Sequence, residues 1–375
     1  MKRQTILVLA MVAVVHLSTS ESNADPSVLY DAVILHPSGF DLSKGQGISG
    51  GQQVGYGHAT GDWDHAVLWS GTPESVVDLH PSGFDWSVAA NVSEGQQVGH
   101  GYRVGESGGY NTRALLWQGT AQSVIDLHPT GFDYSLAIGI SGGQQVGYGH
   151  GASTGNLDHA LLWSGSVDSL VDLHVNGFDE TEAYRCSDGY QIGFGWNPTT
   201  TGLAHALLWS GTAESVVDLH PSSFTESWGM GVSANQQVGR GDLDGNWHAL
   251  MWSGTAESVV DLNPSGFTWS EAHDVSDGQQ AGYGYGPATS GNWHALLWSG
   301  TAGSAVDLHT YLPPSYVSSY AVGIDSAGNL VGYAITSGGE NHAVLWSPVP
   351  VPGASILGSL GLGFAGWKLR KRKEL

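Results

Sequence analysis

A tryptophan tag that recurs seven times constrains the fold of this chain more than any other feature. The tag is Leu-Trp or Met-Trp, usually preceded by His-Ala, and its tryptophans are Trp69, Trp117, Trp163, Trp209, Trp252, Trp298 and Trp346, spaced 43 to 48 residues apart. Turn-forming Gly, Ser, Asp and Pro divide each unit into four short strands, which in the third unit are 135–141, 144–149, 159–163 and 169–174. Four strands in about 46 residues is the size of a β-propeller blade.

The two ends of the repeat region predict a closed ring. Residues 28–37 read as a fourth strand without its first three, and the last unit stops after its third strand at 342–346. The N-terminal strand can therefore complete the last blade, which removes a free sheet edge. The alternative fold, a parallel β-solenoid, would gain no additional strand pairing from this offset. We predict an all-β, seven-bladed β-propeller of four-stranded blades, closed by the N-terminal strand.

The first strand of each unit carries a small residue at one position, and we place this strand next to the axis, where crowding demands small side chains. The residues are Gly45, Ala89, Ala137, Ala183, Gly229, Ala272 and Ala321. Three positions later stands Ile or Val in six units and Cys186 in the fourth. This slot predicts that the single cysteine is a small buried hydrophobe rather than a reactive thiol.

Composition excludes several classes of function. The net charge is −22, and residues 25–347 hold 5 basic against 32 acidic residues. No basic surface is available to displace counterions from a phosphate backbone, so nucleic acid is excluded as a partner. The apolar content of 41% argues against disorder. Such an acidic body favours cations or neutral sugars as ligands.

The two ends of the chain predict export. Residues 1–24 have the layout of a signal peptide, with cleavage after Ala24. Residues 348–353 are a Pro-rich spacer, and 354–375 are a short apolar helix followed by a basic terminus. This end resembles a PEP-CTERM sorting tail, which implies transient membrane anchoring in a Gram-negative cell envelope and processing by an exosortase-type enzyme near Pro350 and Pro352. The family's Pro-Glu-Pro has Val351 in place of Glu here, and a plain C-terminal anchor is the alternative.

The body, 25–347, resembles the extracellular HAF repeat family in its His-Ala-x-Leu-Trp tag followed by Val-Asp-Leu. The resemblance implies an exported, propeller-like protein of the cell surface or extracellular matrix. It implies no activity.

Departures from the repeat supply the candidate site. Aromatic and acidic residues occupy variable positions of the first strands, and the acidic ones concentrate in the fourth to sixth units. We expect a ligand-binding cluster at one mouth of the channel, formed by Trp86, Tyr134, Glu182, Glu226, Trp228, Trp269, Glu271 and His273. Aromatic faces with carboxylates suit sugar rings, whereas a solvated variable face remains the plainer interpretation. Glu182, Glu226 and Glu271 would be the carboxylates of a glycosidase or lyase if held about 5 to 10 Å apart.

The remaining repeated residues favour structure over chemistry. Two histidines recur in nearly every unit, and because their copies are distributed around the ring they are expected to hydrogen-bond to neighbouring turns. Asp/Gly loops such as 61–64, 155–158 and 242–246 leave calcium open as an alternative, although none has the full twelve-residue calcium pattern. No cofactor and no metal site is predicted. The favoured function is non-enzymatic binding of extracellular polysaccharide or another envelope component, and the alternatives are a secreted glycoside hydrolase or lyase and a structural scaffold.

Overall fold

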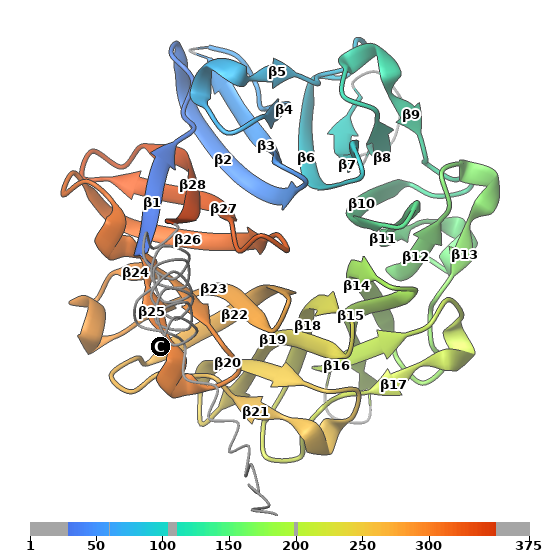
Figure 1. Ribbon diagram of the computed structural model, residues 1–375. Helices are drawn as coiled ribbons and strands as arrows, with labels where there is room; N and C mark the ends of the chain where they lie inside the picture. Colours follow the sequence, from blue (N-terminus) through green and yellow to red (C-terminus); the bar gives the residue numbers. More distant parts are fainter. Residues whose placement is uncertain (1–28, 60, 104–110, 199–201, 350–375) are drawn as a thin grey trace, which may run out of the picture.

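The computed structural model describes residues 29–59, 61–103, 111–198 and 202–349, and these form seven four-stranded antiparallel sheets arranged in a ring (Figure 1). This confirms the predicted seven-bladed β-propeller. The predicted signal peptide (1–24) and most of the predicted spacer and tail (348–375) lie outside the described residues. Among the described residues, no helix is long and apolar enough to cross a membrane.

Each blade runs from an inner strand at the axis to an outer strand at the rim. The inner strands are β2 (Phe40–Ser49), β6 (Trp86–Ser93), β10 (Tyr134–Ser141), β14 (Glu180–Ser187), β18 (Ser227–Ser233), β22 (Trp269–Ser276) and β26 (Tyr316–Ile324). The second strands are β3 (Gln52–Ala59), β7 (Gln96–Tyr102), β11 (Gln144–His150), β15 (Tyr190–Asn197), β19 (Gln236–Leu243), β23 (Gln279–Tyr285) and β27 (Leu330–Thr336). We number the blades 1 to 7 from β2 to β26.

The third strands carry the tryptophan tag, and the outer strands are short. The third strands are β4 (His65–Trp69), β8 (Thr112–Trp117), β12 (His159–Trp163), β16 (Leu203–Trp209), β20 (Asn246–Trp252), β24 (Trp293–Trp298) and β28 (Asn341–Val349). The outer strands are β5 (Val77–Asp78), β9 (Ile125–Asp126), β13 (Val171–Asp172), β17 (Val217–Asp218), β21 (Val260–Asp261), β25 (Val306–Asp307) and, in blade 7, β1 (Leu29–Ile34).

The outer strands are shorter than the sequence predicts because single-turn 3₁₀ helices precede them. In blades 1 to 6 these turns are Pro73–Ser75, Ala121–Ser123, Val167–Ser169, Ala213–Ser215, Ala256–Ser258 and Ala302–Ser304, and further 3₁₀ turns in the described part of the chain include Ala152–Thr154, Pro287–Thr289 and Leu308–Tyr311. In blade 3 the Ser169 hydroxyl donates to the Ser166 carbonyl and accepts from the Ser164 N–H at 2.7 Å. These side-chain bonds satisfy the local backbone in a turn and take residues 169 and 170 out of the ladder.

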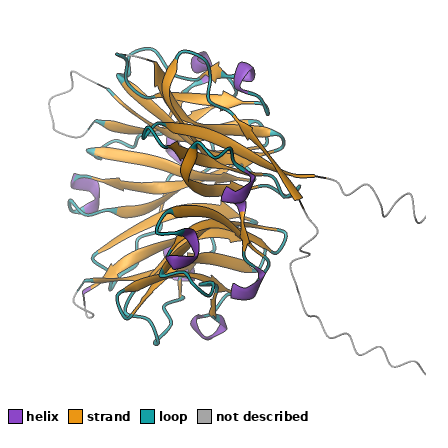
Figure 2. Ribbon diagram, turned by 90° about the vertical axis from the view of Figure 1, so that its left-hand side faces the viewer, coloured by secondary structure: helices purple, strands orange, loops and turns teal. Residues whose placement is uncertain are grey.

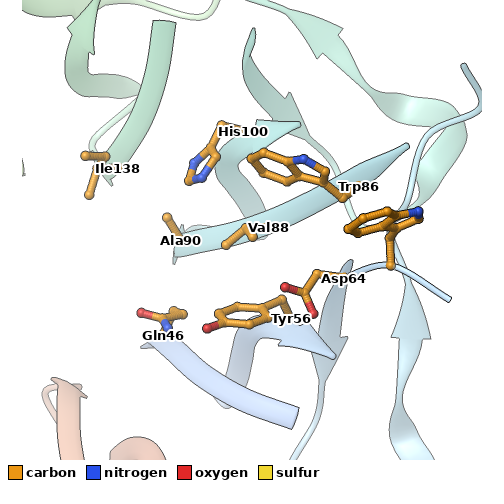
Figure 3. A pocket seen from close by; sticks show the side chains of 9 residues that line it. Gln46, Tyr56, Asp64, Trp86, Val88, Ala90, His100 and Ile138 are labelled. Atoms are coloured by element: carbon orange, nitrogen blue, oxygen red, sulfur yellow. The ribbon is translucent and has the colours of Figure 1, made fainter. Parts of the chain in front are cut away.

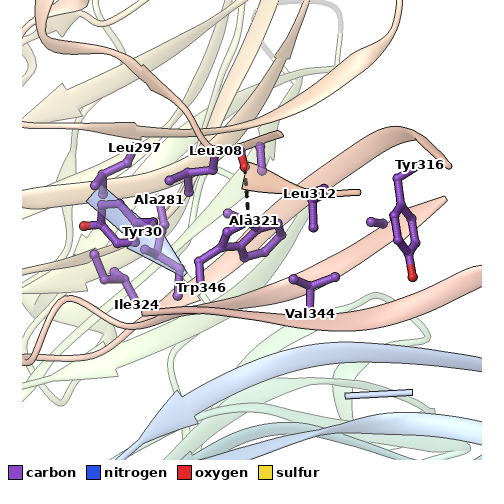
Figure 4. Packing of buried hydrophobic residues seen from close by; sticks show 13 residues of the cluster. Tyr30, Ala281, Leu297, Leu308, Leu312, Tyr316, Ala321, Ile324, Val344 and Trp346 are labelled. Carbon is purple, nitrogen blue, oxygen red and sulfur yellow. Dashed lines mark hydrogen bonds between the residues drawn. The ribbon is translucent and has the colours of Figure 1, made fainter. Parts of the chain in front are cut away.

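Ring closure follows the predicted offset. β1 pairs antiparallel with β28, from Leu29 opposite Val349 to Ile34 opposite Val344. β28 thereby extends two residues into the predicted spacer. Tyr30 of β1 packs into a buried cluster with Trp346, whose indole N–H donates to the Leu308 carbonyl at 3.2 Å (Figure 4).

The core consists of one apolar cluster for each pair of neighbouring blades, and the seven tag tryptophans are fully buried. Cys186 is 6% exposed and belongs to the cluster between blades 3 and 4, as its slot predicts. Burial raises the pKa of its thiol to about 12, which makes it a poor nucleophile.

The small residue of each inner strand is required by the neighbouring blade rather than by the axis. A β-carbon on Gly45 would lie 2.5 Å from Val331 on β27, and one on Gly229 would lie 2.6 Å from Ile192 on β15. The side chain at this position therefore points between two blades and fills the last space left by the second strand of the preceding blade. The expected residue pattern is confirmed, but the reason for it is inter-blade packing.

The first glycine of each Val-Gly-x-Gly segment is fixed by a close backbone approach. A β-carbon on Gly147 of β11 would lie 1.8 Å from the Leu136 carbonyl oxygen of β10. We expect Gly147→Ala to lower the free energy of unfolding by about 3 kcal/mol or more, because the two strands must separate to admit a methyl group. Gly303→Ala is the matched control, since nothing lies within 4 Å of its β-carbon position. Chemical denaturation of both variants checks this, and equal stabilities would contradict it.

A histidine and a Ser or Thr hydroxyl connect neighbouring blades at six of the seven junctions. At the junction between blades 1 and 2, His80 Nε2 donates to the Phe84 carbonyl at 3.0 Å, and the Ser87 hydroxyl donates to His80 Nδ1 at 2.9 Å. Ser87 Oγ also accepts the N–H of Ala66 in blade 1 at 3.0 Å. His65, whose Nδ1 donates to Asp78 at 3.0 Å, stacks on His80 with ring centroids 3.9 Å apart. The repeated histidines thus hydrogen-bond to turns as expected, and they also connect neighbouring blades.

Candidate functional site

The ring has two faces, which we call the pocket face, after the pocket described below, and the serine face, after the serines around the axis. The inner strands begin at the pocket face, where Trp86 stands. They end at the serine face, where Ser49, Ser93, Ser141, Ser187, Ser233, Ser276 and Asp325 follow one another around the axis. Figure 2 shows the strands running between the two faces of the disk.

A pocket of about 540 Å³ opens on the pocket face between blades 1 and 2 (Figure 3). Its lining comes from both inner strands, both second strands, the β3–β4 loop and one residue of β10. The lining residues are Gln46, Tyr56, Trp63, Asp64, Trp86, Val88, Ala90, His100 and Ile138. A concave site with aromatic walls and a few polar groups is the usual form of a small-ligand site.

Trp86 is held as one wall of this pocket. It is the first residue of β6, and its register partner on β7 is Tyr102, whose ring stacks parallel to the indole at 6.1 Å. The His100 ring meets the same indole edge-on at 5.6 Å. Two neighbours therefore fix the indole plane while leaving it half-buried.

The pocket exists because the inner-strand side chains are small in this sector. In each blade, the inner-strand residue immediately before the small residue pairs with the third residue of the Val-Gly-x-Gly segment on the second strand. The seven pairs form a belt of side chains on the pocket face. The belt residues are Lys44, Tyr56, Val88, His100, Leu136, Tyr148, Glu182, Phe194, Trp228, Arg240, Glu271, Tyr283, Tyr320 and Tyr333. In blade 5, Trp228 stacks on Phe194 at 4.0 Å and Arg240 lies over Trp228 at 4.5 Å, so bulky side chains fill that sector. In blade 2, Val88 and Ala90 leave the space open.

Four polar side chains line the pocket. Asp64 Oδ1 lies 2.8 Å from His58 Nδ1. Burial, with a contribution from Asp64, raises the pKa of Tyr56 to about 12, so its hydroxyl stays protonated. Burial also lowers the pKa of His100 to about 4, which keeps that ring neutral at neutral pH. With Gln46, the pocket offers neutral hydrogen-bonding groups and one carboxylate between aromatic walls.

Of the residues predicted for the site, Trp86 lines this pocket. Trp228, Glu271 and His273 lie in a separate cluster between blades 5 and 6. Glu271 is 7% exposed, and its carboxylate lies 2.8 Å from Arg240 Nη1 and 3.4 Å from His273 Nε2, while the Tyr283 hydroxyl donates to it at 3.1 Å. Burial alone would raise the pKa of Glu271, but the hydrogen bonds and charges of His273 and Arg240 outweigh burial and lower it to about 2. This carboxylate is held ionised by protein partners.

Glu182 and Tyr134 have other partners. Glu182 is 7% exposed, accepts a hydrogen bond from Tyr184 at 2.9 Å, and has its pKa raised to about 7 by burial. The Tyr134 hydroxyl donates to Asp158, and the Tyr134 ring stacks on His150.

Glu226 and Trp269 complete the predicted set. Glu226 is half-buried just before β18, and its backbone carbonyl accepts from the Asp242 N–H at 3.0 Å. Trp269 is 38% exposed and donates to Asn246 at 3.2 Å. The predicted set is therefore distributed along the pocket face rather than gathered in one cavity.

Sequence reasoning missed most of the pocket because it considered the inner strands alone. Tyr56 and His100 stand at the third position of the Val-Gly-x-Gly segment. This position is Tyr in four units and Phe, His or Arg in the others, and this aromatic and polar pattern is the signal that could have found them. Trp63 and Asp64 lie in a loop interpreted as a turn or a calcium loop.

The carboxylates of two Asp/Gly loops are bonded to nearby protein groups. Asp62 Oδ1 accepts the Trp63 N–H at 2.9 Å, and Asp158 bonds Tyr134 and lies 3.3 Å from His150. Among the described residues, no group of three or more His, Cys, Asp or Glu side chains is arranged to hold a metal ion.

A smaller recess of about 220 Å³ lies at the serine face. At its floor, one inner-strand position is Gly in four blades and Asn91, Arg185 or Asp274 in the other three. Arg185 donates to the Ile138 carbonyl at 3.2 Å, and Asp274 accepts the Ile324 N–H at 3.0 Å. Each of these two side chains thus bonds to the backbone of a neighbouring blade.

Comparison with known proteins finds solved structures with a similar fold. Neither a family model nor a curated protein matches the sequence. A solved puromycin hydrolase is similar with a TM-score of 0.53 and 15% identity, over 83% of this chain and 52% of that chain. The Pyrococcus horikoshii acylaminoacyl peptidase is similar with a TM-score of 0.51 and 8% identity, over 85% of this chain and 54% of that chain. The chain thus spans about half the length of these two proteins.

The β-propeller domain of the Trilobed protease from Pyrococcus furiosus is similar over almost its whole length. Its TM-score is 0.53 at 8% identity, and the match covers 82% of this chain and 95% of that domain. That domain is described as having an open velcro topology, whereas here β1 closes the ring on β28. At these identities the likeness concerns the fold alone.

Proposed function

We propose that this protein is an exported cell-surface or matrix propeller that binds a neutral extracellular polysaccharide, without catalysis, in the pocket between blades 1 and 2. The observation that carries the proposal is the pocket lining, in which Trp63, Trp86 and Tyr56 surround the Asp64 carboxylate. Sugar rings present apolar faces that pack on aromatic rings, and hydroxyls that donate to carboxylates.

Charge narrows the ligand class. Residues 25–347 carry 32 acidic against 5 basic residues, and Asp64 lines the pocket itself. An anionic polymer would approach against this field, so a neutral polysaccharide fits better.

Export rests on sequence features outside the described residues. The signal peptide ending at Ala24 and the PEP-CTERM-like tail support delivery to the envelope of a Gram-negative bacterium. In this proposal the tail anchors the protein transiently until an exosortase-type enzyme processes it near Pro350 and Pro352.

Hydrolysis is the second candidate function, and one observation favours it. The pKa of Glu182 is raised to about 7 and that of Glu271 is lowered to about 2, which is the divergence that an acid and a base of a glycosidase need. The similar solved structures include proteins named as a hydrolase and a peptidase, but the likeness is confined to the fold. Glu271 is already bonded by Arg240 and Tyr283, so a binding role remains the better-supported proposal.

The proposal predicts that Trp86 is required for ligand binding, whereas the equivalent Trp269 is not. Trp86→Ala should lower affinity at least about tenfold, because it removes the half-buried wall of the pocket. Trp269→Ala is the matched control, since Trp269 occupies the same position of blade 6 outside the pocket. Residues 25–349 would be screened against neutral and acidic polysaccharides, with bound material and released reducing sugar read from the same wells.

The outcomes separate the candidate functions. Binding without product, lost in Trp86→Ala alone, supports the binding protein. Product that disappears in Glu182→Gln or Glu271→Gln supports the hydrolase. If neither binding nor product is detected, the structural scaffold is the function that the result supports.

A further inference from the structure

Trp63 is the most exposed large apolar side chain among the described residues, at 69%. It lies in the β3–β4 loop and lines the same pocket as Trp86. Leaving most of an indole in water forgoes the stabilisation that burial would give, so a side chain held in this state requires a reason.

The loop fixes Trp63 on both sides. The Trp63 N–H donates to Asp62 Oδ1 at 2.9 Å. On the other side, Asp64 is bonded through Oδ1 to His58 at 2.8 Å, and its carbonyl accepts the Ser87 N–H of blade 2 at 2.8 Å. The backbone that carries Trp63 is therefore held against two blades, and it presents the indole to solvent at the pocket. An aromatic ring on a held backbone suits a ligand platform, because less chain ordering is needed on binding.

The two tryptophans of the pocket differ in depth. Trp86 is half-buried against Tyr102 and His100 at the start of an inner strand. Trp63 comes from a loop beyond the end of β3 and stands mostly in solvent. Trp63 therefore offers a second aromatic surface in the same pocket, from a different element than Trp86.

We propose that the ligand occupies two successive positions, with one sugar unit against Trp86 and Tyr56 and the next unit against Trp63. This inference rests on the proposed function. It makes the ligand class a neutral oligosaccharide or polysaccharide chain of at least two hexose units, and it makes Trp63 the residue that selects for chain length.

The test is a chain-length series. Glucose-, mannose- and galactose-based oligomers of one, two and four units are titrated calorimetrically into the full propeller and into Trp63→Ala, Trp63→Phe and Trp269→Ala. In the unmodified protein, we expect at least one series to bind about tenfold more tightly as the tetramer than as the monomer. Trp63→Ala should abolish this gain, with a larger loss of tetramer affinity than of monomer affinity, while Trp63→Phe and Trp269→Ala should retain the gain.

Two results would overturn the inference while leaving the proposed function intact. They are an equal loss of monomer and tetramer affinity in Trp63→Ala, and a length gain that survives this substitution. If no polysaccharide or oligomer binds the unmodified protein, the proposed function itself fails. Thermal unfolding serves as the folding control, since removal of a side chain that is 69% exposed should leave the melting temperature unchanged.

Discussion

Acidification from pH 7.5 to 5 is expected to destabilise a Glu182→Gln propeller by several kcal/mol. In the unmodified protein, Glu182, whose pKa burial raises to about 7, takes up a proton in this range and opposes the loss. The groups responsible for the loss are the histidines that connect neighbouring blades, and the pKa is lowered by burial and then by the stacked partner histidine in His36, His80, His174, His220 and His309. Each neutral ring accepts a hydrogen bond at Nδ1 from Ser or Thr. Protonation turns that acceptor into a donor and breaks the bond, at about 1 kcal/mol for each.

The direction of this effect follows from proton linkage. The unfolded chain binds protons at the ordinary histidine pKa of 6.5, whereas the folded chain binds them only at lower pH. The stabilisation is therefore complete above pH 6.5 and is lost as the pH falls from 6.5 through the lowered pKa values. Asp172 and Asp218 affect stability at lower pH. Burial opposes the shift, but hydrogen bonds from His159 and His205 lower their pKa, so their contribution is lost only below the ordinary value of 3.8.

The junction between blades 5 and 6 supplies the control for this prediction. Asn263 stands at the histidine position there, donates to the Phe267 carbonyl at 3.3 Å and accepts from Ser270 at 2.7 Å. His80→Asn should therefore keep both bonds and reduce the pH dependence by about one seventh, since it removes one of the seven histidines whose pKa is lowered in the fold. Urea unfolding at pH 7.5 and 5 measures the change. In the Glu182→Gln background, an unfolding free energy that is flat across this range would refute the histidine mechanism.

Trp163→Ala is expected to cost about 3 to 5 kcal/mol of unfolding free energy, with a melting temperature lower by about 10 °C. Trp163 is fully buried in the cluster that joins blades 2 and 3, where it packs with Leu116, Leu127 and Ile140. Truncation leaves a cavity between two sheets whose backbones are fixed by their own ladders, so the site cannot collapse.

Trp63→Ala is the control of the same residue type, because Trp63 is 69% exposed. Its unfolding free energy should change by less than about 0.5 kcal/mol. Calorimetry on both variants gives the comparison. Similar melting temperatures would show that the tag tryptophans do not hold the blades together.

The repeat predicted nearly all of the fold because a propeller imposes the same environment seven times. Seven copies of each strand type give seven independent views of one packing problem, and Cys186 is the clearest case. Its environment was predictable from Ile140 and Val232 in equivalent slots. Ring closure was predictable from the missing strands at the two ends.

The site was harder to predict because a pocket forms where side chains are missing. Val88 and Ala90 are unremarkable in the sequence, and only the bulk of Trp228 and Tyr184 at the equivalent positions shows what blade 2 lacks. Contacts across blades added a second obstacle. Arg240 lies in the second strand of blade 5, and its ion pair with Glu271 of blade 6 could not be read from the first strands.

The closing strand also determines how the ring responds to force. β28 runs from the pocket face to the serine face between β27 and β1, and it ends at Val349, opposite Leu29. A pull on residue 349 away from the disk is therefore directed along β28 and works in shear, so that the ladders on both sides resist together instead of opening one bond at a time. A pulling force applied at residue 349 therefore acts at the serine face, opposite the pocket between blades 1 and 2.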